Sequence, residues 1–132
     1  MEAEKVFKKL QLHKAINPLI VNAPDVFAPV VSGIQYDSEP MKGKEGSYDF
    51  VLIFADTQAE LEKLAKYVEK AGKYDCIFWA CYPKMTGKIK SDIKRETVWI
   101  AFELIGLQAV TAIAIDDTWS GLRARPVDKV GK

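Results

Sequence analysis

The sequence predicts an α/β fold in three layers, built on a mainly parallel sheet that finishes in a C-terminal antiparallel hairpin. Two apolar runs, residues 48–55 (YDFVLIFA) and 75–82 (DCIFWACY), lack the alternation of a half-exposed strand, which is typical of strands covered on both faces. One helical pattern separates these runs and another follows them. Strands that alternate with helices favour a parallel sheet with right-handed crossovers, so the predicted architecture is Rossmann-like.

The chain opens on a helical pattern that leads into a strand. Residues 2–12 (EAEKVFKKLQL) place Val6, Phe7 and Leu10 at helical spacing, which predicts a short amphipathic helix. Residues 18–23 (PLIVNA) then predict the first strand, which ends where the polar and proline residues begin.

The next segment carries weaker signals. Residues 24–31 (PDVFAPVV) predict a helical turn or two, because Pro29 limits any longer helix. Residues 33–37 (GIQYD) predict a weak second strand, and the polar residues 38–47 (SEPMKGKEGS) predict an exposed loop.

A helix is predicted from Thr57 onward. Thr57 and Glu60 have the T-x-x-E spacing of a capping box. In this motif the side chain of each residue accepts a hydrogen bond from the backbone N–H of the other. We expect Gly72 to end this helix. Its buried face is predicted to consist of Leu61, Leu64, Ala65, Val68 and Ala71.

A second helix is predicted to end at Gly106, and a hairpin follows it. The predicted face of this helix carries Val98, Trp99, Phe102 and Ile105, and we interpret Trp79, Trp99 and Phe102 as core residues. Residues 108–115 (QAVTAIAI) and 119–125 (WSGLRAR) predict two strands, joined by a turn at 116–118. The single domain is predicted to cover 1–126, with a disordered tail at 127–132.

Composition narrows the class of protein. Its 132 residues suit one domain, and 19 basic against 18 acidic residues leave a net charge of +1. No overall field therefore draws the chain to nucleic acid or to a membrane. Its longest apolar runs have the length of strands, and the N-terminus lacks an apolar signal-peptide core, so we expect a soluble cytoplasmic protein.

Cys76 and Cys81 lie roughly 16 Å apart on opposite faces of one predicted strand, so they cannot form a disulfide with each other. We therefore expect both to be reduced core thiols.

Residues 82–96 (YPKMTGKIKSDIKRE) form a cationic loop after a predicted parallel strand. Parallel sheets bind ligands beyond the carboxyl ends of their strands, and this loop would lie there with Asn22 and Asp56. Gly87-Lys88 lacks the spacing of a phosphate-binding P-loop. A solvated basic loop is the alternative interpretation. The candidate anion-binding residues of the loop are Lys84, Gly87, Lys88 and Lys90.

The last strand supplies the other predicted anion ligands, Arg123 and Arg125. With a period of two residues, both arginines share one face with Trp119. Stacking on that indole or pairing with the aspartates of the turn is the structural alternative. The polar lining of the predicted pocket is Asp92, Asp116, Asp117, Thr118 and Trp119.

The sequence offers little support for a metal site or for a catalytic nucleophile. Asp116 and Asp117 could join Asp56 or Asp92 around a divalent cation, but adjacent aspartates in a hairpin are usually turn formers, and we predict no metal. His13 is the only histidine. Cys81 is the one plausible thiol nucleophile, and it lacks an obvious base.

Two resemblances follow from these motifs. The segments FWACYPKMTGKIKSDIKRETVW and GLQAVTAIAIDDTWSGLRARP resemble an uncharacterised bacterial family of unknown function, which implies a compact α/β domain and no activity. The order of strands, capped helix and terminal hairpin is similar to the second half of class I S-adenosylmethionine-dependent methyltransferases. Where such enzymes carry a glycine-rich turn, this chain has NAPDVFAP, and Asp37 would take the place of the ribose-binding acid.

Three hypotheses of function remain open. The leading one is a non-enzymatic domain that binds an anionic small molecule, or an acidic or phosphorylated partner, at the carboxyl rim of the sheet. The second is a reduced methyltransferase-like enzyme at the same rim. The third is a structural module that forms homo-oligomers through an edge strand or an aromatic patch. The sequence names no cofactor and leaves open whether a reaction is catalysed.

Overall fold

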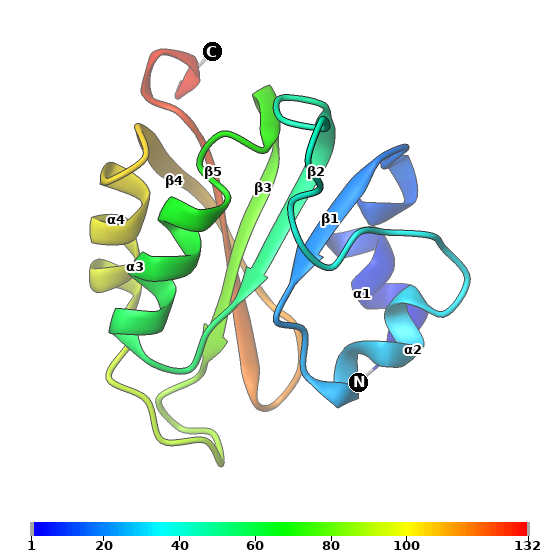
Figure 1. Ribbon diagram of the computed structural model, residues 1–132. Coiled ribbons are helices and arrows are strands. Elements are labelled where there is room, and N and C mark those ends of the chain that lie inside the picture. The colour runs from blue at the N-terminus through cyan, green and yellow to red at the C-terminus, as the bar shows by residue number, and fades with distance from the viewer. Residues whose placement is uncertain (1, 132) are drawn as a thin grey trace.

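A computed structural model describes residues 2–131 and contains one five-stranded sheet (Figure 1). The order across the sheet is β1-β2-β3-β5-β4, with β1, β2 and β3 parallel and β5 antiparallel to both of its neighbours. The predicted α/β fold with a C-terminal hairpin is therefore confirmed. The strands are β1 (Pro18–Val21), β2 (Tyr48–Phe54), β3 (Gly72–Pro83), β4 (Leu107–Ala114) and β5 (Trp119–Pro126).

Helices cover both faces of the sheet and make the fold three-layered (Figure 1). The α1 and α2 helices lie on one side, whereas α3 and α4 lie on the other. The helices are α1 (Ala3–Lys9), α2 (Ala28–Val31), α3 (Gln58–Tyr67) and α4 (Arg95–Glu103), with short 3-10 helices at Leu12–Lys14 (η1), Asp25–Phe27 (η2) and Val127–Lys129 (η3). The η3 helix lies within residues 127–132, which the sequence predicts to be a disordered tail. Residue 132 lies outside the described residues.

Two separate cores follow from the unbroken apolar strands. Val51 and Ile53 of β2 pack toward α3 and α4, and Phe50, Leu52 and Phe54 pack toward α1 and α2. Alternate side chains of one strand are thus buried on opposite faces, as the two-sided apolar run predicts.

The start of α3 shows half of the predicted capping box. The hydroxyl of Thr57 accepts a hydrogen bond from the backbone N–H of Glu60 at 3.2 Å. The Glu60 carboxylate accepts from the N–H of Asp56 at 3.2 Å, one residue earlier than the capping box requires. The helix therefore begins where predicted, with Glu60 joining it to the end of β2.

Gly72 does not end α3, which stops at Tyr67, but begins β3. A Cβ at Gly72 would lie 2.5 Å from Sγ of Cys76 and 3.2 Å from a methyl carbon of Val51. The glycine is required here by close packing inside the sheet. The chain bulges at this point, since Tyr48 pairs with Gly72 but Phe50 pairs with Ile77.

Two further predictions are wrong. The expected strand at 33–37 is reduced to one parallel bridge between Asp37 and Leu19, because residues 32–34 form a turn after α2, in which the N–H of Ile34 donates to the carbonyl of Val31. Trp99 is not a core residue. Val98 and Phe102 are buried in α4, but Trp99 is 50% exposed beside the open edge of the sheet.

Candidate functional site

The carboxyl ends of the parallel strands meet at one edge of the sheet, which we call the carboxyl edge. It carries Asn22 after β1, Asp56 after β2, the loop 84–94 after β3, and the β4–β5 turn (lower edge in Figure 1). This is where an open parallel sheet ordinarily binds ligands.

The loop 84–94 is anchored at both ends. The backbone N–H of Lys84 donates to the carbonyl of Thr118 at 2.8 Å, and Gly87 lies so close that a Cβ would be 3.4 Å from Thr118 Cα. At the other end, Ile93 is buried, and Asp92 accepts a hydrogen bond from the backbone N–H of Gln58 at 2.7 Å. The loop is thus held between the β4–β5 turn and the first turn of α3.

The lysines of this loop that the sequence predicts as anion ligands have no counter-ion in the described part of the chain. Lys88 and Lys90 are exposed, and Lys84 is partly buried. Within residues 2–131, none of the three makes an ion pair. The three lysines that the sequence predicts as anion ligands therefore lie, with Gly87, on the loop that joins β3 to α4.

The two aspartates predicted to line the pocket belong to the turn. The Asp116 carboxylate accepts hydrogen bonds from the backbone N–H groups of Thr118 at 2.9 Å and Trp119 at 2.7 Å, so it acts as a turn former. Asp117 is exposed. Trp119 is buried, with its ring 5.3 Å from that of Phe54, and therefore does not line a polar pocket.

The predicted convergence of Arg123 and Arg125 with the lysine loop is wrong. Both arginines share a face of β5 as expected, but β5 begins at the carboxyl edge and runs away from it, so that Arg123 lies opposite Trp79. Arg125 donates from Nε to Asp75 at 2.9 Å and from Nη2 at 2.7 Å. Its partner is therefore Asp75, near the start of β3, rather than an aspartate of the β4–β5 turn.

The pKa values of Arg123 and Arg125 are shifted in opposite directions by their surroundings. The guanidinium of Arg125 lowers the pKa of the Asp75 carboxyl, and that carboxylate raises the pKa of Arg125. Burial and the neighbouring Arg125 lower the pKa of Arg123, whose buried Nε has no hydrogen-bond partner among the described residues. Asp75 is not among the site residues that the sequence predicts, because period-two alternation along β5 holds no information about the partner of Arg125.

The carboxyl ends of β1 and β2 are linked by side chains of the protein itself. Asn22 adopts a left-handed φ of +63°, and its Nδ2 donates to the carbonyl of Phe54 at 2.8 Å and to Glu60 Oε1 at 3.4 Å. The buried ring of Phe27 lies 4.9 Å from the ring of Phe54. An asparagine side chain thus joins the carboxyl ends of β1 and β2.

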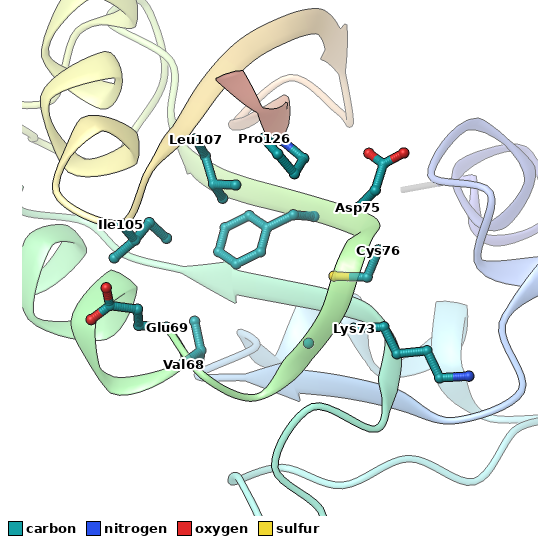
Figure 2. A pocket seen from close by; sticks show the side chains of 10 residues that line it. Val68, Glu69, Lys73, Asp75, Cys76, Ile105, Leu107 and Pro126 are labelled. Atoms are coloured by element: carbon teal, nitrogen blue, oxygen red, sulfur yellow. The ribbon is translucent and has the colours of Figure 1, made fainter. Parts of the chain in front are cut away.

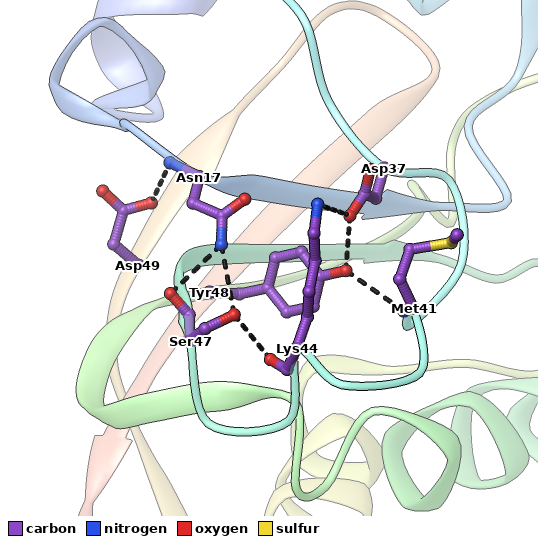
Figure 3. Close-up of polar contacts among 7 residues, drawn as sticks. All are labelled: Asn17, Asp37, Met41, Lys44, Ser47, Tyr48 and Asp49. Atoms are coloured by element: carbon purple, nitrogen blue, oxygen red, sulfur yellow. Dashed lines mark hydrogen bonds and ion pairs between the residues drawn. The ribbon is translucent and has the colours of Figure 1, made fainter.

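Asp37 is held in a polar cluster at the opposite end of the sheet (Figure 3). Its Oδ2 accepts from Nζ of Lys44 at 2.8 Å and from the hydroxyl of Tyr48 at 2.5 Å. The hydrogen bond from Lys44, then that from Tyr48, lowers the pKa of the Asp37 carboxyl. This carboxylate is therefore engaged by its neighbours rather than presented at the carboxyl edge.

Neither cysteine suits nucleophilic chemistry. Cys81 is fully buried, and this burial raises the pKa of its thiol well above the ordinary value. Cys76 lies on the other face and lines a hollow of about 60 Å³ beside Phe78 and Leu107 (Figure 2). Burial, followed by the charges of Asp49 and Asp75, raises the pKa of Cys76 to about 11.

Residues 2–131 contain no group of three or more His, Cys, Asp or Glu side chains arranged to hold a metal ion. His13 lies before β1, at the opposite end of the sheet from the lysine loop, with its ring 6.3 Å from that of Phe7. No helix in the described part of the chain is long and apolar enough to cross a membrane.

The fold is similar to that of solved methyltransferases. A SAM-dependent methyltransferase from Aquifex aeolicus superposes with a TM-score of 0.61 at 14% identity, covering 93% of this chain and 88% of that one. A putative type 11 methyltransferase from Sulfolobus solfataricus gives 0.59 at 14% identity, covering 98% and 82%. The N-methyltransferase NodS from Bradyrhizobium japonicum gives 0.57 at 10% identity, covering 95% and 96%.

At these identities the likeness concerns the fold alone. No family model matches the chain, and no curated protein matches it. The resemblance to a bacterial family of unknown function therefore stays a prediction. The chain has a Rossmann-like fold of the kind that S-adenosylmethionine-dependent methyltransferases use.

Proposed function

We propose that this chain is a non-catalytic binding domain with a methyltransferase-like fold, which holds an anionic segment of a partner on the loop 84–94. The observation that carries the proposal is that Lys84, Lys88 and Lys90 make no ion pair within residues 2–131, combined with the anchoring of their loop at Thr118 and Gln58. Anchored cations without counter-ions attract an anion at small conformational cost.

The exposure of Lys88 and Lys90 favours an extended segment over a small molecule. Small-molecule sites are usually concave and bury most of the ligand surface. Lys88 and Lys90 are exposed to solvent. Such a surface suits a flexible acidic or phosphorylated segment, whose charges are spaced along the chain.

The anion-binding role leaves Arg123 and Arg125 out of the proposed site. Arg125 is neutralised by Asp75, and both arginines lie away from the carboxyl edge along β5. We keep Lys84, Gly87, Lys88 and Lys90 as the proposed contact residues, with Asp92 and Thr118 as anchors of the loop.

A second candidate is a reduced methyltransferase-like enzyme, which the likeness of fold favours. Two observations weigh against it. Asn22 joins the carboxyl ends of β1 and β2, and Asp37 is engaged by Lys44 and Tyr48. Calorimetry with S-adenosylmethionine tests this candidate, and heat of binding that disappears in Asn22→Asp would support it.

Fluorescence anisotropy with a labelled peptide rich in phosphoserine and aspartate tests the leading proposal. We expect salt-dependent binding that weakens about tenfold or more when Lys84, Lys88 and Lys90 are all changed to alanine. The matched control changes Lys42, Lys63 and Lys70 to alanine, three exposed lysines outside the loop. Equal weakening by both triple variants would reduce the effect to net charge and would contradict the proposed site.

A further inference from the structure

The outer edge of the sheet is a strand without charge. The β4 strand ends the strand order and, within residues 2–131, pairs only with β5. Its eight residues, LQAVTAIA, contain no charged residue and no proline. Edge strands normally carry such residues to prevent pairing with another strand. The features that interrupt the edge of β4 are a bulge at Val110 and one hydrogen bond, from Nζ of Lys9 to the carbonyl of Ala114 at 3.3 Å.

Apolar side chains continue this edge onto α4, which lies beside β4 (Figure 1). Trp99 is 50% exposed, and the exposed Val110 and Val127 line the same hollows, while Leu104 is exposed further along the chain after α4. Trp99 lines two adjoining hollows of about 390 and 340 Å³, one along residues 109–112 and one along residues 107–109. The indole therefore lies beside the middle of β4, between two depressions in the surface.

Charge is arranged symmetrically about Trp99. Arg95 lines one hollow and Glu103 lines the other, and each is four residues from Trp99 on the same stripe of α4. Both charged side chains are exposed, and neither makes an ion pair within the described chain. A two-fold axis that passes beside Trp99 would thus place Arg95 of each copy opposite Glu103 of the other copy and create two equivalent charge pairs.

We propose that β4 and α4 form an isologous interface with a second copy of this chain. The two β4 strands pair antiparallel on either side of the Val110 bulge and join the sheets into one of ten strands. The two Trp99 rings meet near the axis, and each Arg95 contacts Glu103 of the partner subunit. A second copy fits this surface because it supplies the uncharged strand, the aromatic ring and both complementary charges at the required spacing. The inference is independent of the anion-binding loop.

Charge reversal tests this arrangement by sedimentation velocity over a range of protein concentrations. We expect the wild type to approach twice its 14.8 kDa mass as concentration rises. Arg95→Glu and Glu103→Arg should each weaken the dimer about tenfold, because two attractions become two repulsions. The double variant should restore it. Lys63→Glu, an exposed change on α3, serves as the control and should leave the mass unchanged.

Amide hydrogen exchange of the wild type gives a test that needs no variant. The amides of β4 should exchange more slowly at high protein concentration than at low concentration, because pairing protects them. The proposed interface would be overturned by a monomeric mass at every concentration or by β4 exchange that does not depend on concentration. It would equally be overturned by a dimer that resists both single reversals, or by a double variant that stays monomeric.

Discussion

Arg125 holds Asp75 through two parallel hydrogen bonds, of 2.9 and 2.7 Å, between the last strand and the start of β3. Such bidentate contacts are among the stronger ion pairs in proteins. The pair fixes the end of β5 against the bulge of β3 and removes one of the two arginines from any ligand site. Its stability contribution depends on pH.

Replacement of Asp75 by asparagine is expected to destabilise the protein at neutral pH and not in acid. Asparagine tolerates the left-handed φ of +60° at this position, so the change removes charge without straining the backbone. Arg125 lowers the carboxyl pKa in the folded state. The stabilisation is therefore complete above the unfolded pKa of about 3.9 and disappears as pH falls through the lower folded value.

Urea unfolding of wild type and Asp75→Asn at a series of pH values measures this dependence. The difference in free energy of unfolding should be constant near neutral pH and shrink below about pH 4. A difference that stays the same down to the lowest pH would show that the charge of Asp75 does not supply the effect.

Gly72→Ala is expected to destabilise the fold by about 1–3 kcal/mol, because its Cβ would lie 2.5 Å from Sγ of Cys76. Thermal or chemical unfolding measures the change. Gly33→Ala is the matched control, since a Cβ there meets nothing within 4 Å. The double variant Gly72→Ala with Cys76→Ala should recover part of the loss, and strict additivity of the two changes would contradict the proposed clash.

Thr57→Ala is expected to lower the free energy of unfolding by about 1 kcal/mol, because it leaves the N–H of Glu60 without its cap. Thr86→Ala, on the exposed part of the lysine loop, is the control and should change stability little. Denaturant unfolding compares the two. Equal effects of both substitutions would refute the role of Thr57 as the helix cap.

The thiol of Cys76 is expected to react slowly with alkylating reagents at neutral pH, and its rate should keep rising toward pH 11, following its raised pKa of about 11. Cys81 should react only on unfolding, because it is fully buried. Mass spectrometry of timed alkylation separates the two sites, with Cys76→Ser as the single-thiol reference. A rate for Cys76 that levels off near pH 8.5, as for a free thiol, would contradict this assignment.

The sequence is sufficient to predict the layers and the hairpin because each rests on local patterns. The unbroken apolar run of β2 places alternate side chains in two cores, and Thr57 marks the start of α3. Alternation along β5 also gives the correct face for Arg123 and Arg125. Periodicity, however, specifies a face and not a position along the strand, so it could not place these arginines relative to the lysine loop.

The remaining errors come from tertiary contacts. Helical spacing places Trp99 next to the buried Val98, but it holds no information on whether a layer covers that side of α4. The left-handed turn at Asn22 and its hydrogen bond to Phe54 likewise depend on the neighbouring strand. An asparagine directly after a short apolar strand is the one local signal that could have suggested this turn.

The central proposal is that the loop 84–94 binds an anionic segment, and backbone chemical-shift mapping tests it most directly. On titration with the phosphoserine-rich peptide, we expect salt-sensitive shifts at Lys84, Gly87, Lys88 and Lys90, extending to their anchor at Thr118. Shifts confined to the far end of β5 around Arg123, or an unchanged spectrum at low salt, would contradict it.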